Sequence, residues 1–265
     1  MARVVSMSVE RSWLRARAAL ACLLLGLLVS AARAASPPPP LALAAGARVG
    51  VVNLLDAEVT HYHAAPRVQD GFLKTQPVPW SVSAMLLEAV REPLTRVGLV
   101  PVPLAPGDTL SRARESCFLD ANLQKALPKD CVAPYTRLAA DEHLAALIVL
   151  GPGLNDSNHA QATRRKDLPD YLRGWCVVSG SGEGGTAPVL LNLTELLLIS
   201  VTPKGPQLDA RAWGGTFTQN WTGFVASPGP QALPAPQLEQ LQPLFAALLR
   251  QQTQGLLFGR LAPGH

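Results

Sequence analysis

Short continuous apolar runs and amphipathic stretches alternate along this chain. The first run, residues 49–55, ends at the charged residue Asp56, and another, residues 145–150, is closed by a Gly-Pro-Gly triplet. Apolar runs of this length are typical of strands buried on both faces. We therefore predict that the stretch beginning at Arg48 is the central strand of a sheet and that residues 145–150 form a second buried strand.

Three amphipathic stretches predict helices. Apolar residues recur at three-and-four spacing over residues 81–97, and again over about 20 residues from Leu238. Pro93 should kink the first of these helices, and Gly98 is placed to end it. A shorter helix is expected over residues 134–143. The last helix should lie on the sheet and close the fold.

The remaining strands are predicted from residue type and turn signals. Residues 99–104 contain two alternating prolines, which allow only an edge strand. Three strand candidates then follow one another, residues 173–179, 188–201 and 209–217, and Gly-rich or Pro-Gly separators make them antiparallel neighbours. Loops are expected in the segments 61–79 and 154–172, and the segment 105–133 is read as a polar excursion with one short helix.

This order predicts an α/β (α+β) fold. Parallel strands with crossover helices give way to hairpins, which implies a mixed sheet of about five to six strands with helices packed on it. Residues 48–265 are read as a single globular domain, and the proline-rich residues 35–47 as an extended tether.

The amino-terminal 34 residues read as a secretory signal peptide. A basic region precedes an apolar stretch, residues 18–30, and Ala32-Arg33-Ala34 fits the small-x-small cleavage pattern. The alternative is a retained amino-terminal anchor. Cleavage after Ala34 would leave no membrane span and place the protein in the periplasm or outside the cell.

Export changes the charge balance. Residues 1–34 hold five of the 23 basic residues and one of the 19 acidic residues, which leaves 18 of each in the mature chain. A formally neutral chain gives no support for nucleic acid or an anionic membrane as a partner.

Three cysteines remain after residue 34. In an oxidising compartment Cys117 and Cys131 can form a disulfide across the loop between them, worth about 3 kcal/mol in the chain-entropy model. Cys176 lies in a predicted strand, where a buried inert thiol is the simpler interpretation and a reactive thiol the alternative.

The residues after the first strand include two alternating histidines. His61 and His63 point to the same side of an extended chain and could bind one metal ion, zinc being the natural choice. Exposed polar loop residues are the alternative interpretation. The ligands that could join them are His159, Asp56, Glu58 and Asp156.

Catalytic and cofactor motifs are not recognised. Gly180-Ser181-Gly182 lacks the frame of a nucleophile elbow, and the glycines after residue 150 lack the lysine of a phosphate-binding loop. We therefore assign no catalytic residue and no cofactor other than the candidate zinc ion. Trp221 and Phe224 follow the last predicted strand, and an exposed aromatic patch there would mark a partner surface.

A family resemblance rests on Arg48-Val49-Gly50-Val51-Val52-Asn53, on residues 139–151 and on the paired strands that follow. This layout resembles the periplasmic α/β module shared by the curli secretion protein CsgG, the penicillin-binding-protein activator LpoB and the amino-terminal domain of TolB. The resemblance implies action through protein contacts at the cell envelope rather than catalysis.

Two functions follow as expectations. The first is an exported, non-enzymatic accessory or interaction protein of the bacterial cell envelope with an envelope protein as its partner. The alternative is a metal-binding protein or metal-dependent hydrolase that uses the His61 and His63 region.

Overall fold

The computed structural model describes residues 41–65, 71–118, 126–153, 168–169, 171–180, 188–216, 218–225, 232–258 and 260–261. The predicted signal peptide and the first part of the predicted tether lie outside these ranges. Residues 40–265 form one compact unit. No helix in the described ranges has the length and the hydropathy that a membrane crossing requires.

The described residues form an α/β fold with nine strands and four helices. The class is as predicted, but the sheet has more strands than the five to six expected. The strands are β1 (Arg48–Asn53), β2 (Glu58–Ala64), β3 (Phe72–Pro77), β4 (Val100–Leu104), β5 (Ala146–Pro152), β6 (Gly174–Gly180), β7 (Val189–Thr202), β8 (Gly205–Trp213) and β9 (Thr218–Asn220); the helices are α2 (Val82–Arg96), α3 (Gly107–Phe118), α4 (Lys129–Asp141) and α5 (Ala235–Leu257).

The sheet is mixed, with the order β3-β2-β6-β7-β5-β1-β4. β1 pairs in parallel with β4 and β5, and β2 pairs in parallel with β6. The pairs of β7 with β5, β6, β8 and β9 are antiparallel. β4 therefore ends the sheet, as its alternating prolines predict.

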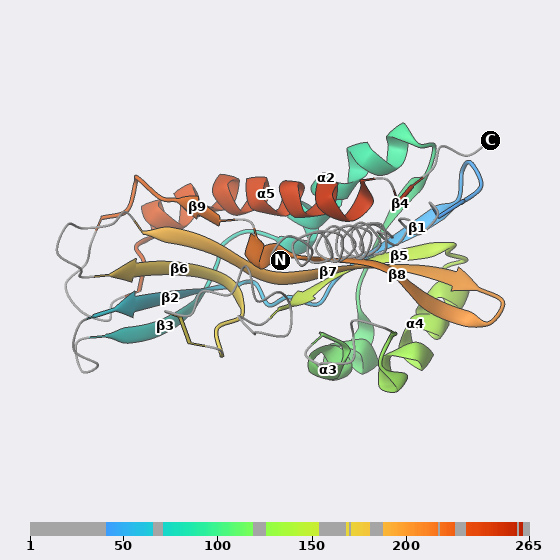
Figure 1. Ribbon diagram of the computed structural model, residues 1–265, viewed down its shortest axis with the longest axis horizontal. Helices are drawn as coiled ribbons and strands as arrows, with labels where there is room; N and C mark the ends of the chain where they lie inside the picture. The colour runs from blue at the N-terminus through green and yellow to red at the C-terminus, as the bar shows by residue number, and fades with distance from the viewer. Residues whose placement is uncertain are drawn as a thin grey trace, which may run out of the picture. The chain divides into compact units, whose positions relative to one another are not determined.

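The long strand β7 joins two half-sheets (Figure 1). Its first part pairs with β6 on one side and β9 on the other, and its second part pairs with β5 and β8. Along one side Leu193 is paired with Gly174 and Thr194 with Pro152, so β6 and β5 meet end to end. β7, and not β1, is thus the strand around which the fold is organised.

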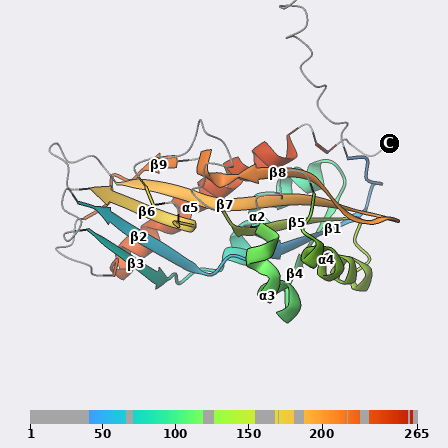
Figure 2. The ribbon, with the colours of Figure 1, turned by 60° about the horizontal axis from the view of Figure 1, so that its bottom comes forward.

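Helices cover both faces of the sheet. Figures 1 and 2 show α2 and α5 on one face and α3 and α4 on the other. Apolar side chains of α2 and α5 pack with β1, β5 and β7 in one core cluster, while α3 and α4 contribute to a second cluster on the opposite face. This double cover explains why residues 190–200 of β7 are all buried.

Local signals placed α2 and α5 correctly. The Ser81 hydroxyl caps α2 by accepting from the backbone N–H of Ala84, and Gly98 follows the helix with a φ of 78°. Pro93 lies inside α2, as expected. α5 occupies residues 235–257 and contributes Leu241, among others, to the core beneath it.

Other boundaries were wrong. The predicted loop 61–79 contains most of β2 and all of β3, and the excursion 105–133 holds α3 and the start of α4. The last predicted strand, residues 209–217, is instead β8 followed by a short 3-10 turn at Gly214–Thr216 and β9. In the segment 61–79, Pro77 is the last residue of β3, so a proline there ends a strand and does not exclude one.

The predicted disulfide is present. Cys117 near the end of α3 bonds to Cys131 near the start of α4, and both are fully buried. Cys176 is a free, buried thiol on β6, and burial raises its pKa to about 12. A thiol with so high a pKa carries almost no thiolate at neutral pH, which fits the inert interpretation.

Candidate functional site

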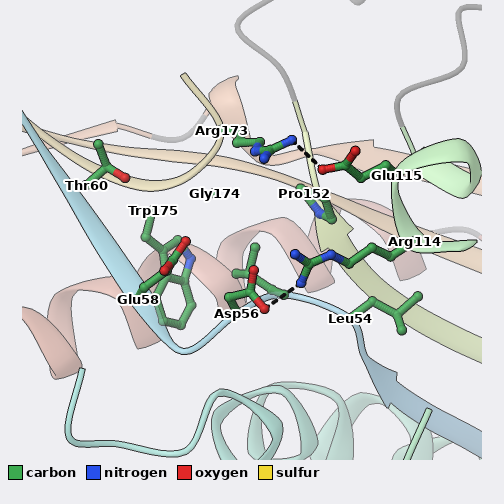
Figure 3. Close-up of a pocket in the computed structure, with 11 residues that line it drawn as sticks. Leu54, Asp56, Glu58, Thr60, Arg114, Glu115, Pro152, Arg173, Gly174 and Trp175 are labelled. Atoms are coloured by element: carbon green, nitrogen blue, oxygen red, sulfur yellow. Dashed lines mark hydrogen bonds and ion pairs between the residues drawn. The ribbon is translucent and has the colours of Figure 1, made fainter. Parts of the chain in front are cut away.

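A small cleft lies where the two half-sheets separate (Figure 3). It is bordered by the carboxyl ends of β1 and β5, by the first residues of β2 and β6, and by α3. Ligands in open α/β sheets commonly bind at such strand ends. The lining residues are Leu54, Leu55, Asp56, Glu58, Thr60, Arg114, Glu115, Pro152, Arg173, Gly174 and Trp175.

Ion pairs occupy this cleft. The Arg114 guanidinium donates to the Asp56 carboxylate, and Arg173 donates to Glu115 at 2.8 Å (Figure 3). The remaining cavity measures about 30 Å³, room for about two water molecules at roughly 10–15 Å³ each. In this conformation the ion pairs across the cleft therefore join α3 to the strand ends of the sheet.

A second polar cluster lies on the face of the sheet that α5 covers. His61 Nε2 lies 2.8 Å from the Ser179 hydroxyl oxygen, and His63 Nδ1 lies 2.9 Å from the same oxygen. The parallel register of β2 and β6 pairs His63 with Ser179. Both imidazoles are thus on one side of β2 and meet at a single oxygen atom.

Aromatic rings hold the two imidazoles in place. The Phe72 ring of β3 stacks on His63 with centroids 5.2 Å apart and meets the edge of His61 at 4.9 Å. Phe224 packs edge-to-face on His61 at 5.5 Å. His61 is only 5% exposed, while His63 is half-buried.

The hydrogen positions of the cluster follow from burial. His61 Nδ1 is buried with no hydrogen-bond partner among the described residues. A buried N–H without an acceptor costs about 1–3 kcal/mol, so the proton of His61 belongs on Nε2. We therefore assign a chain in which His61 Nε2–H donates to Ser179 and the Ser179 hydroxyl donates to His63 Nδ1.

Burial, and secondly the nearby His63, lowers the pKa of His61 from 6.5 to about 4. The unfolded chain then binds more protons than the folded protein between these two pH values. Stability is fully present above pH 6.5 and falls as the pH drops towards 4, by up to about 3 kcal/mol. Urea unfolding at a series of pH values should show this loss.

His61→Phe is the variant that tests this assignment. It retains an aromatic ring and removes the titration, so its stability should change less between pH 6.5 and 4 than that of the wild type. His143→Gln replaces a histidine outside the cluster and serves as the control. An unchanged acid response in the His61 variant would contradict the assignment.

The metal ligands expected from the sequence do not all assemble. Asp56 and Glu58 line the cleft, and Asp56 pairs with Arg114, whereas the two histidines contact Ser179. His159 and Asp156 lie outside the described residues. Within the described ranges, His, Cys, Asp and Glu side chains form no group of three or more able to hold a metal.

The expected exposure of Trp221 is not observed. Its side chain is 3% exposed and belongs to the core beneath α5, and its backbone N–H donates to the Pro188 carbonyl. Phe224 is partly buried and packs on both Trp221 and His61. Phe224 therefore packs between Trp221 and His61, and the two aromatic residues do not form an exposed patch.

No protein-family model, curated protein or solved structure matches this chain.

The edge strand β3 is a further candidate surface. Among the described strands it pairs only with β2, so no described strand pairs with its other side. Lys74 and Thr75 are exposed, and Leu73 is 46% exposed. Neither β3 nor the role of Ser179 was predicted, because residues 61–79 were interpreted as a loop.

Proposed function

We propose that this protein is an exported, non-enzymatic accessory protein of the cell envelope that binds a partner protein at the β3 edge of its sheet. The observation that carries the proposal is an edge strand that keeps its backbone donors and an exposed leucine. An extended segment of a partner can add to such an edge as a further strand.

The two ends of the main sheet differ in their capacity to pair. On β4 the backbone N–H of Val100 donates to the Ala47 carbonyl next to β1. Because backbone groups alternate along a parallel strand, the backbone groups of residues 101 and 103 point to the other side of β4, away from β1. Both are prolines, which have no N–H to offer to another strand. Within β3, by contrast, only the terminal residue Pro77 lacks a backbone donor.

The side chains of β3 suggest the chemistry of the partner segment. Leu73 is paired across the strands with the half-buried Tyr62, which makes one face of the edge apolar. Lys74 projects on the opposite face because side chains alternate along a strand. A partner strand with apolar residues on one face and an acidic residue on the other fits this edge.

Export is supported by the chemistry of the cysteines. A fully buried disulfide between Cys117 and Cys131 is the kind of bond that forms in oxidising compartments. The leader-like residues 1–34 and the neutral charge of the remaining chain are consistent with a protein that works in the envelope.

A comparison of two matched variants tests this proposal. Leu73 and Val100 are 46% and 45% exposed on edge strands β3 and β4, so aspartate at either position should perturb folding similarly. The proteins would be expressed with their leader, cross-linked in the intact envelope and purified.

The Leu73→Asp variant should recover at least about 10-fold less of a defined partner, because burial of a leucine is worth about 1.5–3 kcal/mol. The Val100→Asp variant should recover as much as the wild type. Repeated recovery of no partner by the wild type, or equal losses in both variants, would refute binding at β3.

A further inference from the structure

Three side-chain atoms that can serve as metal ligands lie close together on one face of β2 and β6. His61 Nε2 and His63 Nδ1 both lie within 2.9 Å of the Ser179 hydroxyl oxygen. We propose that His61, His63 and Ser179 form a binding site for a divalent transition-metal ion such as Zn²⁺. This proposal does not depend on partner binding at β3.

The spacing of the three atoms suits a small ion. Zinc binds imidazole nitrogen at about 2.0–2.1 Å, so neighbouring ligand atoms in a tetrahedral site are roughly 3.3 Å apart. The nitrogen-to-oxygen separations in the cluster are 2.8 and 2.9 Å. Each nitrogen-to-oxygen pair is therefore about 0.5 Å closer than in such a site and would have to open by that amount to share an ion.

The ligands are held by regular structure. His61 and His63 belong to β2 and Ser179 to β6, and these strands are joined by a continuous parallel ladder. Stacking on Phe72 restricts the His63 ring, and Phe72 and Phe224 flank His61. Little side-chain freedom is thus lost on binding, and a water molecule can complete the coordination from the half-buried His63 side.

The donor set selects the class of ion. Imidazole nitrogen suits zinc, copper and nickel, whereas magnesium and calcium require oxygen ligands, chiefly carboxylates. Among the described residues, these histidines hydrogen-bond to Ser179 and pack against Phe72 and Phe224, with no carboxylate in that set.

The affinity should be lower than that of a zinc site whose histidines keep their outer hydrogen-bond partners. A metal on His61 Nε2 moves the ring proton to Nδ1, which has no acceptor among the described residues. Loss of such an outer partner typically weakens metal binding by about 10- to 100-fold.

Titration of the exported, chelator-treated protein with ZnCl₂ in a calorimeter tests the site. The wild type should bind one ion at micromolar concentration. His63→Ala should weaken binding by at least about 10-fold, since a direct ligand matters no less than an outer partner. His63 is the residue to change because it is half-buried, and thermal melting would confirm that the variant folds.

Two further variants complete this test. His143 lies outside the cluster, so the His143→Ala variant should bind zinc as the wild type does. Ser179→Ala should bind more weakly, and unchanged affinity in that variant would refute the three-ligand site. Absence of saturable binding by the wild type below millimolar zinc, or equal binding by the folded His63→Ala protein, would also refute it, with no consequence for the β3 proposal.

Discussion

Replacing Arg211 with methionine should lower the free energy of unfolding by about 3–5 kcal/mol. The Glu195 carboxylate on β7 is 0% exposed and accepts two hydrogen bonds from the Arg211 guanidinium of β8, at 3.0 and 2.9 Å. Removing the guanidinium takes two charge-assisted hydrogen bonds away from this fully buried carboxylate. Urea unfolding at neutral pH measures the loss.

An exposed ion pair provides the control for Arg211. Arg96 pairs with Glu92 on α2, where the side chains are 73% and 78% exposed, so Arg96→Met should cost no more than about 1 kcal/mol. The double variant Glu195→Leu/Arg211→Met should recover much of the stability, because it removes both charges. Equal effects of the two arginine substitutions would show that the buried pair is not coupled as described.

Replacing Asn192 with leucine should lower the free energy of unfolding by about 1–3 kcal/mol, because the buried indole N–H of Trp175 loses its acceptor while Thr194 and Gln252 still bond each other. Asn192 Oδ1 accepts from Trp175 Nε1 at 3.1 Å and from the Thr194 hydroxyl at 2.8 Å. Its Nδ2 donates to Gln252 of α5 at 2.9 Å. Denaturant unfolding is again the measurement.

Combining Trp175→Phe with Asn192→Leu tests the hydrogen bond from Trp175 Nε1 to Asn192 Oδ1. In the Asn192→Leu background Trp175→Phe removes the indole N–H that would be left without an acceptor, so its cost should be smaller there than in the wild type. Strictly additive effects of the two substitutions would contradict the hydrogen bond between them. The result matters for the fold because Asn192 lies where β5 and β6 meet along β7.

The sequence predicted correctly those elements whose signals lie within a few neighbouring residues. Residues 49–55 are apolar apart from Asn53, residues 145–150 are apolar throughout, and the two runs largely coincide with β1 and β5. α2 carries its own cap at Ser81 and its own stop at Gly98. Information of this kind is present in a few neighbouring residues, and it identifies elements without specifying which strands pair.

The role of β7 could not be read from its sequence. Its residues predict a strand, but four strands pair with it through contacts with segments far along the chain. The polar residues Asn192, Thr194 and Glu195 are buried in its interior because partners on α5, β6 and β8 satisfy them. Periodicity alone does not reveal such partners.

The histidine cluster was only half predictable. Alternation along an extended chain placed His61 and His63 on one side, and the structure shows both at one oxygen. Ser179 was missed because its approach requires the parallel pairing of β2 with β6, and β2 had been interpreted as a loop. Asp56 was grouped with the histidines by sequence proximity, yet it pairs with Arg114 of α3.

Binding of a protein partner at the β3 edge is tested most directly by a photo-activatable cross-linking residue placed at position 73 and, separately, at position 100. The two sites match in exposure, at 46% and 45%, and both lie on edge strands. After irradiation of the intact envelope, position 73 should give one defined adduct with another protein, and position 100, beside outward-facing prolines, should give none. Equal adducts at both positions, or none at position 73, would contradict the proposed function.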